Sequence, residues 1–106
     1  MGPIRTLFLI GQTAGGKGAV GAVLARQIGA EIISLDSMKV YRGMDIGTAK
    51  PPAERRRQVP HHMIDVVDPR EHFSTALYVA GAERVVKDII SRGAVPLFVG
   101  GMALYL

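Results

Sequence analysis

The sequence predicts an α/β fold built on a parallel sheet, and three observations lead to that prediction. Short apolar runs suited to buried strands alternate with segments that repeat apolar residues at helical spacing. Glycine-rich turns follow the first and the last of these runs. The chain has 106 residues and 48% hydrophobic content, which predicts one small folded domain over residues 1–106.

The first part of the chain is predicted to form a strand, a loop, a helix and a second strand. Residues 6–10 (TLFLI) are an apolar run that stops at a glycine, as a buried strand does. Residues 17–28 predict a helix whose inner face comprises Val20, Val23, Leu24 and Ile28. Residues 31–35 (EIISL) predict the next strand, which ends at Asp36. We expect a right-handed crossover between the two parallel strands.

Residues 37–60 carry glycines, prolines and an arginine run that oppose long regular elements. We interpret this segment as an ordered functional loop with a short helix near residues 53–58. A short strand is predicted at residues 63–67, and Asp68-Pro69 should form the turn that follows it.

A long helix and a third buried strand complete the pattern. Ser74 is positioned to cap a helix over residues 74–91, whose inner face comprises Tyr78, Ala82, Val85, Val86, Ile89 and Ile90. Gly81 within this helix costs up to ~1 kcal/mol relative to alanine, so we expect close packing there. Residues 95–99 (VPLFV) predict the strand, and the pair 100–101 then offers two unobstructed backbone amides.

The charge of the chain is concentrated in one segment. Residues 39–57 hold six basic and two acidic side chains, whereas the remainder holds seven of each sign, so this segment accounts for the net charge of +4. Such a field attracts phosphate or nucleic acid, although a solvated loop is an equally open alternative. The absence of cysteine excludes disulfides and thiolate zinc sites. With no signal peptide or apolar run long enough to span a membrane, the sequence predicts a cytoplasmic protein without a membrane partner.

A phosphate-binding loop is predicted between the first strand and the first helix. The GxxxxGK pattern is formed by Gly11, Gln12, Thr13, Ala14, Gly15, Gly16 and Lys17. A diphosphate would be held by the backbone N–H groups of the loop, the Lys17 charge and the helix N-terminus. A loop of this kind between a strand and a helix favours a three-layer fold like that of P-loop NTPases. Gly18 replaces the usual Ser or Thr ligand of magnesium, so any Mg²⁺ here is expected to be held through water.

Asp36 follows the second strand, at the edge where open α/β sheets bind their ligands. Its carboxylate could hold magnesium through water or take a proton from an attacking nucleophile, and a simple turn residue is the alternative. His61 and His62 are adjacent, so in a strand they would point to opposite faces. This argues against one zinc ion bound by both.

Four segments of the chain resemble the N-terminal part of the tRNA dimethylallyltransferases, also called isopentenyl-tRNA transferases. They are GQTAGGKG, DSMKVYRGMDIGTAKP, HHMIDVVDP and FVGGMALYL. The adenylate isopentenyltransferases are similar at a greater distance. The resemblance implies transfer of a dimethylallyl group from dimethylallyl diphosphate to N6 of the adenosine next to the anticodon, position 37 of tRNA. The magnesium cofactor and the anticodon loop as partner follow from the same resemblance.

The resemblance also implies roles for individual residues. Asp36 matches the general base, Lys17 would stabilise the leaving diphosphate, and residues 13–18 match the part that touches the prenyl donor. The tRNA contacts are implied for Asp36, Ser37, Met38, Lys39 and Met102. Three of these residues depart from the family pattern, namely Gly18, Lys39 in place of a common Gln, and Met102 in place of a usual Thr.

Family members continue beyond this length, so the resemblance predicts a truncated chain of doubtful activity. A sheet cut short there would expose an edge and favour self-association. Two other functions stay open: a small P-loop kinase or nucleotidase, and a non-catalytic nucleotide-binding remnant. The DIGTAKP segment favours the transferase over the kinase, because a generic kinase has no need of it. Gly18 and Met102 favour the remnant.

Overall fold

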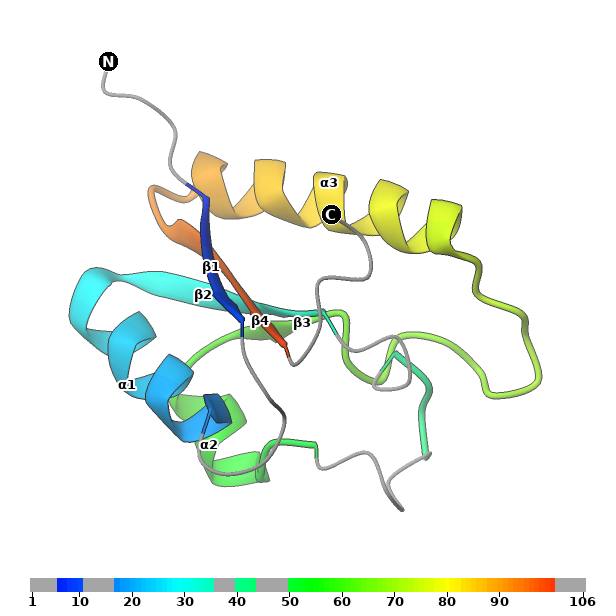
Figure 1. The fold of residues 1–106 in the computed structure, drawn as a ribbon, viewed down its shortest axis with the longest axis horizontal. Helices are drawn as coiled ribbons and strands as arrows, with labels where there is room; N and C mark the ends of the chain where they lie inside the picture. Colours follow the sequence, from blue (N-terminus) through cyan, green and yellow to red (C-terminus); the bar gives the residue numbers. More distant parts are fainter. Residues whose placement is uncertain (1–5, 11–16, 36–39, 44–49, 101–106) are drawn as a thin grey trace.

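Four parallel strands form one sheet in the order β1–β4–β2–β3 (Figure 1). The structure, a computed structural model, describes residues 6–10, 17–35, 40–43 and 50–100. The strands are β1 (Leu7–Ile10), β2 (Ala30–Ser34), β3 (His61–His62) and β4 (Val95–Gly100). The helices are α1 (Lys17–Ile28), α2 (Ala53–Gln58) and α3 (Thr75–Ser91). The predicted strands at both ends of the chain and the short helix near residues 53–58 are therefore confirmed.

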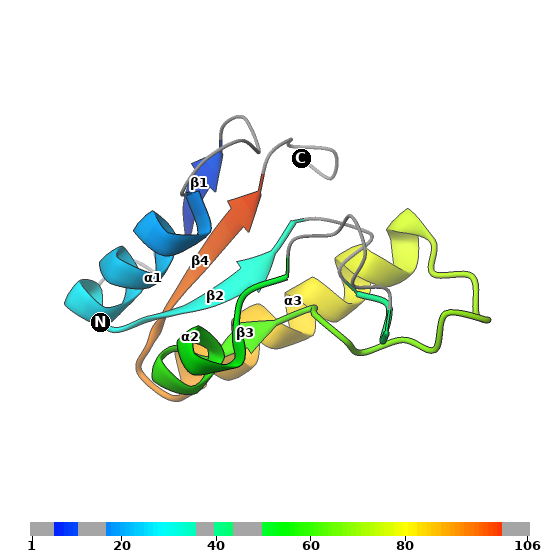
Figure 2. The same cartoon turned by 90° about the horizontal axis from the view of Figure 1, so that it is seen from below.

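The two longer helices lie on opposite faces of the sheet (Figure 2). The chain crosses the sheet twice, in opposite directions. From β1 it crosses over β4 to reach β2, and from β3 it crosses back over β2 to reach β4. Because parallel crossovers are right-handed, two crossovers that run in opposite directions must place their helices on opposite faces. This topology confirms the predicted α/β fold with three layers and a parallel sheet.

The core has two halves, one on each face of the sheet, because successive strand residues point to opposite sides. Toward α3, Ile33 and Phe98 pack with Tyr78 and Ile89, and Ile33 and Ile89 are fully buried. Toward α1, the sheet contributes Ala30, Ile32 and Leu97, and Val59 at the end of α2 joins them. The buried strands are thus apolar on both faces, as expected of a parallel sheet covered by helices.

The predicted inner face of α1 is wrong in three of its four residues. Leu24 packs against the core, but Val20, Val23 and Ile28 are exposed. The face that meets the sheet consists instead of Gly21, Ala22 and Ala25. A Cβ atom on Gly21 would lie 3.1 Å from Cγ2 of Val99, so the small residues let the helix lie close to β4.

Helix α3 confirms its prediction in detail. The Ser74 hydroxyl accepts a hydrogen bond from the Leu77 amide at 3.1 Å, as an N-cap does. Gly93 follows the helix with φ +79°, a conformation that glycine adopts without strain. The predicted face is buried or half-buried along its whole length. Gly81 packs closely, because a Cβ there would lie 3.3 Å from Cε of Met63.

The strand predicted at residues 63–67 is wrong, and β3 lies two residues earlier in the chain. Met63 and Asp65 adopt left-handed backbone conformations, with φ values of 64° and 58°, and such residues interrupt a strand. Val67 nevertheless forms an isolated parallel bridge with Tyr41. The segment after β3 therefore turns toward residues 40–43 instead of extending the sheet.

Candidate functional site

The ends of three parallel strands and the start of α1 define the candidate site. Ile10 of β1 is level with Gly100 of β4, and Ser34 of β2 is level with Val99, so these strands end at the same edge of the sheet. Residues 11–16 connect this edge to α1, which begins at Lys17. The free N–H groups and partial positive charge of a helix N-terminus suit an anion. The strand and helix that a phosphate-binding loop requires on either side are therefore present.

Most of the residues assigned to this site from the sequence lie outside the described residues. They are the loop residues Gly11, Gln12, Thr13, Ala14, Gly15 and Gly16, and the proposed RNA contacts Asp36, Ser37, Met38, Lys39 and Met102. Lys17 and Gly18 are described as the first two residues of α1, but not their side-chain surroundings. The approach of the Asp36 carboxylate to Lys17 therefore stays a prediction.

Gly100 permits an unusually close approach of β4 and β2 at the site edge. A Cβ atom on Gly100 would lie 2.5 Å from Cβ of Leu35, far inside normal contact distance. The Leu35 amide also donates a hydrogen bond to the Val99 carbonyl at 3.0 Å. The end of β2 is thus held against β4 immediately before Asp36, and the first glycine of the 100–101 pair is required by packing.

Residues 40–43 rest on the turn that follows β3. The carbonyl of Val40, a buried residue, accepts hydrogen bonds from the amides of Val66 and Val67 at 2.8 and 2.9 Å. The amide of Arg42 in turn donates to the Val67 carbonyl at 2.8 Å. Three backbone bonds therefore hold the start of the basic segment against residues 66–67.

Asp65 binds two cations of the basic segment through its two carboxylate oxygens. Lys50 Nζ lies 2.5 Å from Oδ1, and Arg56 Nη1 lies 2.8 Å from Oδ2. Lys50 also donates to the Tyr41 carbonyl at 2.7 Å, and its side chain is 8% exposed. Partial burial raises the pKa of Asp65, but the bonds from Lys50 and Arg56 outweigh it and hold the pKa below its ordinary value.

These contacts change the interpretation of the positive segment. Lys50 and Arg56 both pair with Asp65, which lies outside residues 39–57, so part of the segment's charge is neutralised by the rest of the protein. Arg42 stays exposed, although its guanidinium bonds backbone carbonyls. The field available to a polyanion is accordingly weaker than the sequence count of charges indicates.

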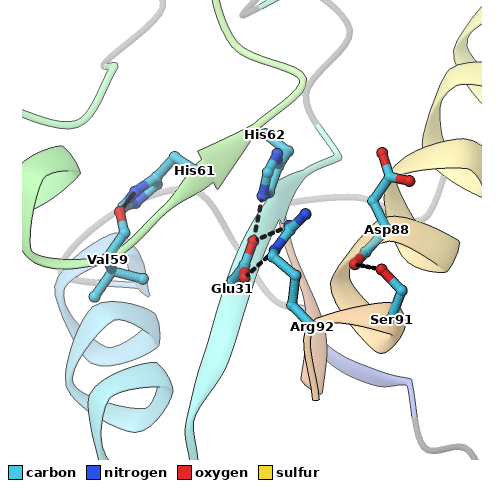
Figure 3. Close-up of polar contacts among 7 residues, drawn as sticks. All are labelled: Glu31, Val59, His61, His62, Asp88, Ser91 and Arg92. Carbon is cyan, nitrogen blue, oxygen red and sulfur yellow. Dashed lines mark hydrogen bonds and ion pairs between the residues drawn. The ribbon is translucent and has the colours of Figure 1, made fainter. Parts of the chain in front are cut away.

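A second charged cluster lies at the opposite edge of the sheet, near the start of β2 (Figure 3). Glu31 accepts two hydrogen bonds from Arg92, at 2.6 and 3.1 Å, and its Oε1 lies 2.7 Å from Nε2 of His62. The bonds from Arg92, opposed by partial burial and helped by His62, hold the pKa of Glu31 below its ordinary value. This cluster joins β2, β3 and the end of α3 and is remote from the candidate site.

The two adjacent histidines point to opposite faces, as predicted (Figure 3). His61 donates from Nδ1 to the Val59 carbonyl at 2.7 Å, whereas His62 meets Glu31. Burial lowers the pKa of His61, which keeps this ring neutral at pH 7. Within the ranges described, no three His, Asp or Glu side chains come close enough together to hold a metal ion.

The surface also carries an apolar hollow between the sheet and α3. Its volume is about 300 Å³, and its walls include Leu35, Tyr78 and Val86. Phe8 of β1 lies at this hollow and is 46% exposed. Its ring is stacked on that of Phe98, with 4.9 Å between the ring centroids.

Among the described helices, none is both long and apolar enough to cross a membrane.

Two protein families match the chain, and together they span nearly all of it. The family described as IPP transferase matches residues 39–106. The family described as isopentenyl transferase matches residues 4–65.

Individual relatives agree with the family matches. The tRNA dimethylallyltransferase of Pelotomaculum thermopropionicum is 52% identical over 94% of this chain and 32% of its own. The tRNA isopentenylpyrophosphate transferase structure from Bacillus halodurans is 47% identical, with a TM-score of 0.91 over 97% of this chain and 34% of its own. A eukaryotic dimethylallyltransferase acting on tRNA is 32% identical with the same TM-score, over 97% and 26%. The chain thus spans about a third of the length of the curated relatives it matches.

Proposed function

The chain belongs to the IPP transferase family, and from this we propose that it supplies the reaction centre of a tRNA dimethylallyltransferase. The proposed reaction transfers a dimethylallyl group from dimethylallyl diphosphate to N6 of adenosine 37 in tRNA. The observation that supports it most is the placement of the GxxxxGK loop between β1 and α1, at the edge where β2 and β4 also end. A diphosphate held there would lie near the end of β2.

Binding of the prenyl donor follows from the phosphate chemistry of this edge. Residues 11–16 supply backbone N–H groups, α1 supplies its N-terminus, and Lys17 supplies a positive charge. As the C–O bond to the diphosphate breaks, negative charge develops on the leaving oxygen, and these donors stabilise it. Magnesium would add charge neutralisation. With Gly18 in place of a hydroxyl residue, we propose that water links the ion to the protein.

The acceptor adenine must leave its stack to bring N6 to the donor. The N6 lone pair forms the new C–N bond, and the Asp36 carboxylate takes the proton that the amine loses. We assign the surrounding RNA contacts to Ser37, Met38, Lys39 and Met102. Lys39 can meet RNA phosphate, whereas Met102 offers the acceptor an apolar contact where a hydroxyl is usual.

A transfer assay tests this proposal. The 106-residue chain (the short chain) and the same chain continued by the remaining two thirds of the Pelotomaculum relative (the extended chain) are incubated with labelled dimethylallyl diphosphate, magnesium and unmodified tRNA. We expect label in the tRNA with the extended chain, and none when Asp36→Asn is introduced. Label that survives Asp36→Asn would remove the assigned base, and an extended chain that binds donor without transferring label would favour the non-catalytic remnant.

A P-loop kinase or nucleotidase is the second candidate, because the loop and the strand-end carboxylate would serve it equally. The same proteins, incubated with ATP in place of the prenyl diphosphate, distinguish the two. Release of phosphate or transfer to a nucleoside, without prenyl transfer, would support the kinase.

We further propose that the protein acts in the cytoplasm, where tRNA is modified. A separate proposal is that the short chain self-associates through β1. Among the described strands β1 pairs with β4 on one side, and Leu7 and Phe8 are 37% and 46% exposed. An unpaired strand edge with apolar side chains invites pairing between copies. Sedimentation should show association that rises with concentration and is reduced by Phe8→Arg. A monomer at all concentrations would exclude it.

A further inference from the structure

Three cations from the basic segment converge on one residue, Asp65. Its carboxylate binds Lys50 and Arg56, which both follow residues 44–49 in the basic segment. Its backbone carbonyl accepts a hydrogen bond from Arg42 Nε at 3.2 Å, and Arg42 Nη2 reaches the next carbonyl, that of Val66, at 3.4 Å. Asp65 thus contacts the segment on both sides of residues 44–49.

The backbone conformation of Asp65 suits contacts on two sides of the residue. Its φ of 58° lies in the left-handed region, which aspartate and asparagine tolerate better than most residues with a side chain. Such a conformation reverses the chain locally. It lets the carboxylate face Lys50 and Arg56 while the adjacent carbonyls face Arg42.

The segment that Asp65 anchors continues directly from the candidate site. Residues 36–39 join Leu35 to Val40, and both of these neighbours are fixed. Leu35 is bonded to β4 through Val99, and Val40 is bonded to the amides of residues 66–67, next to Asp65. Any change in the 65–67 turn therefore moves one of the two ends that position residues 36–39.

We propose that Asp65 is a positioning residue for the acceptor RNA, which it serves by fixing the turn that holds Val40, Arg42 and Lys50. This inference rests on the proposed function, and neither a family match nor a motif assigns the role. Lys50 is too buried to meet RNA, so its charge serves the protein's own geometry. Loss of the Asp65 charge leaves Lys50 and Arg56 without the partner they share, and it loosens the turn that holds Val40, which is one of the two ends of residues 36–39.

Glu31 offers a matched control for Asp65. It too is a partly buried carboxylate with two cationic or ring partners, Arg92 and His62, but it lies at the opposite edge of the sheet. Asp65→Asn and Glu31→Gln each remove one negative charge and keep the side chain nearly isosteric. A difference between the two variants in RNA affinity therefore reports position rather than general destabilisation.

Three measurements on the extended chain test the inference. Binding of an unmodified anticodon stem-loop is followed by fluorescence anisotropy, and KM is determined separately for tRNA and for dimethylallyl diphosphate. Amide hydrogen exchange, also measured on the short chain, reports the N–H groups of Arg42, Val66 and Val67. For Asp65→Asn we expect RNA affinity to fall about tenfold and the three amides to exchange at least about tenfold faster, while the donor KM is unchanged. Glu31→Gln should change neither.

Each result decides the question. Equal loss of RNA affinity in Asp65→Asn and Glu31→Gln overturns the positioning role, as does faster exchange in Asp65→Asn with unchanged RNA affinity. A wild-type chain that binds the stem-loop but transfers no prenyl group refutes the proposed reaction. The positioning role of Asp65 is then decided by the RNA affinities of Asp65→Asn and Glu31→Gln. A wild-type chain that binds no RNA refutes both. Should Asp65→Asn unfold the chain, Arg56→Gln removes one partner from a side chain 33% exposed, with a smaller change of the same kind expected.

Discussion

Replacement of Gly100 by alanine should destabilise the protein, because the added methyl group has no room between β4 and β2. The new Cβ would lie 2.5 Å from Cβ of Leu35 and 3.4 Å from its Cα, where carbon atoms normally rest 3.5–4.0 Å apart. Relief requires the ends of β2 and β4 to separate by about 1 Å, because the Leu35 atoms nearest the methyl group belong to or adjoin the backbone. We expect a loss of about 1–3 kcal/mol in the free energy of unfolding.

Gly81→Ala is the matched control for this prediction. Its Cβ would lie 3.3 Å from Cε of Met63, the far end of a flexible side chain that can move by a few tenths of an ångström. Alanine also gains up to about 1 kcal/mol of helix propensity over glycine inside α3. Gly81→Ala should therefore be neutral or stabilising.

Urea denaturation of both variants, followed by far-UV circular dichroism, gives the two free energies of unfolding. The reasoning predicts a lower transition midpoint for Gly100→Ala and an unchanged or higher midpoint for Gly81→Ala. Equal midpoints in Gly100→Ala and the parent chain would refute the close approach of β2 and β4, and with it the geometry described for the site edge.

Three further predictions concern the core, the remote charged cluster and the metal. Ile89→Ala, at a fully buried position, should cost about 2–5 kcal/mol in urea denaturation, and a loss below 1 kcal/mol would contradict its burial. Because the pKa of Glu31 is depressed in the folded state, its contribution to stability is present above its ordinary pKa of 4.5 and is lost as pH falls through the folded value. The stability gap between the parent chain and Glu31→Gln should accordingly narrow from pH 7 to pH 3, and a constant gap would exclude the ion pair as its cause. Gly18→Thr should tighten magnesium-dependent diphosphate binding in calorimetry, since it restores a hydroxyl ligand, and unchanged affinity would count against a metal at this position.

Sequence periodicity predicted those elements whose packing depends on large apolar side chains. The inner face and cap of α3 were readable in this way, because Tyr78 and Ile89 recur at helical spacing after Ser74. The face of α1 was not, since its contact with the sheet is made by glycine and alanine, which a hydrophobic pattern passes over in favour of Val20 and Val23.

Backbone conformation and distant partners account for the other differences. The MIDVV run has the composition of a strand, but the positive φ of Met63 and Asp65 leaves no trace in an apolar pattern. The ion pairs of Asp65 join residues 15 and 9 positions away, and the Glu31 cluster spans still larger separations. The GxxxxGK pattern could be read from the sequence because its residues are contiguous, and its phosphate binding stays a prediction. The Asp65 and Glu31 clusters form only when the chain has folded.

The short side chains on the sheet-facing side of α1 set the height of that helix above the strands. A bulkier residue at Gly21 or Ala25 would push α1 away from the sheet, and the first turn of the helix would move with it. The distance between the start of α1 and the strand tips is therefore tuned from within the hydrophobic interior. Under the proposed function, a larger residue at Ala25, about two turns from Lys17, should therefore change diphosphate affinity without touching the diphosphate.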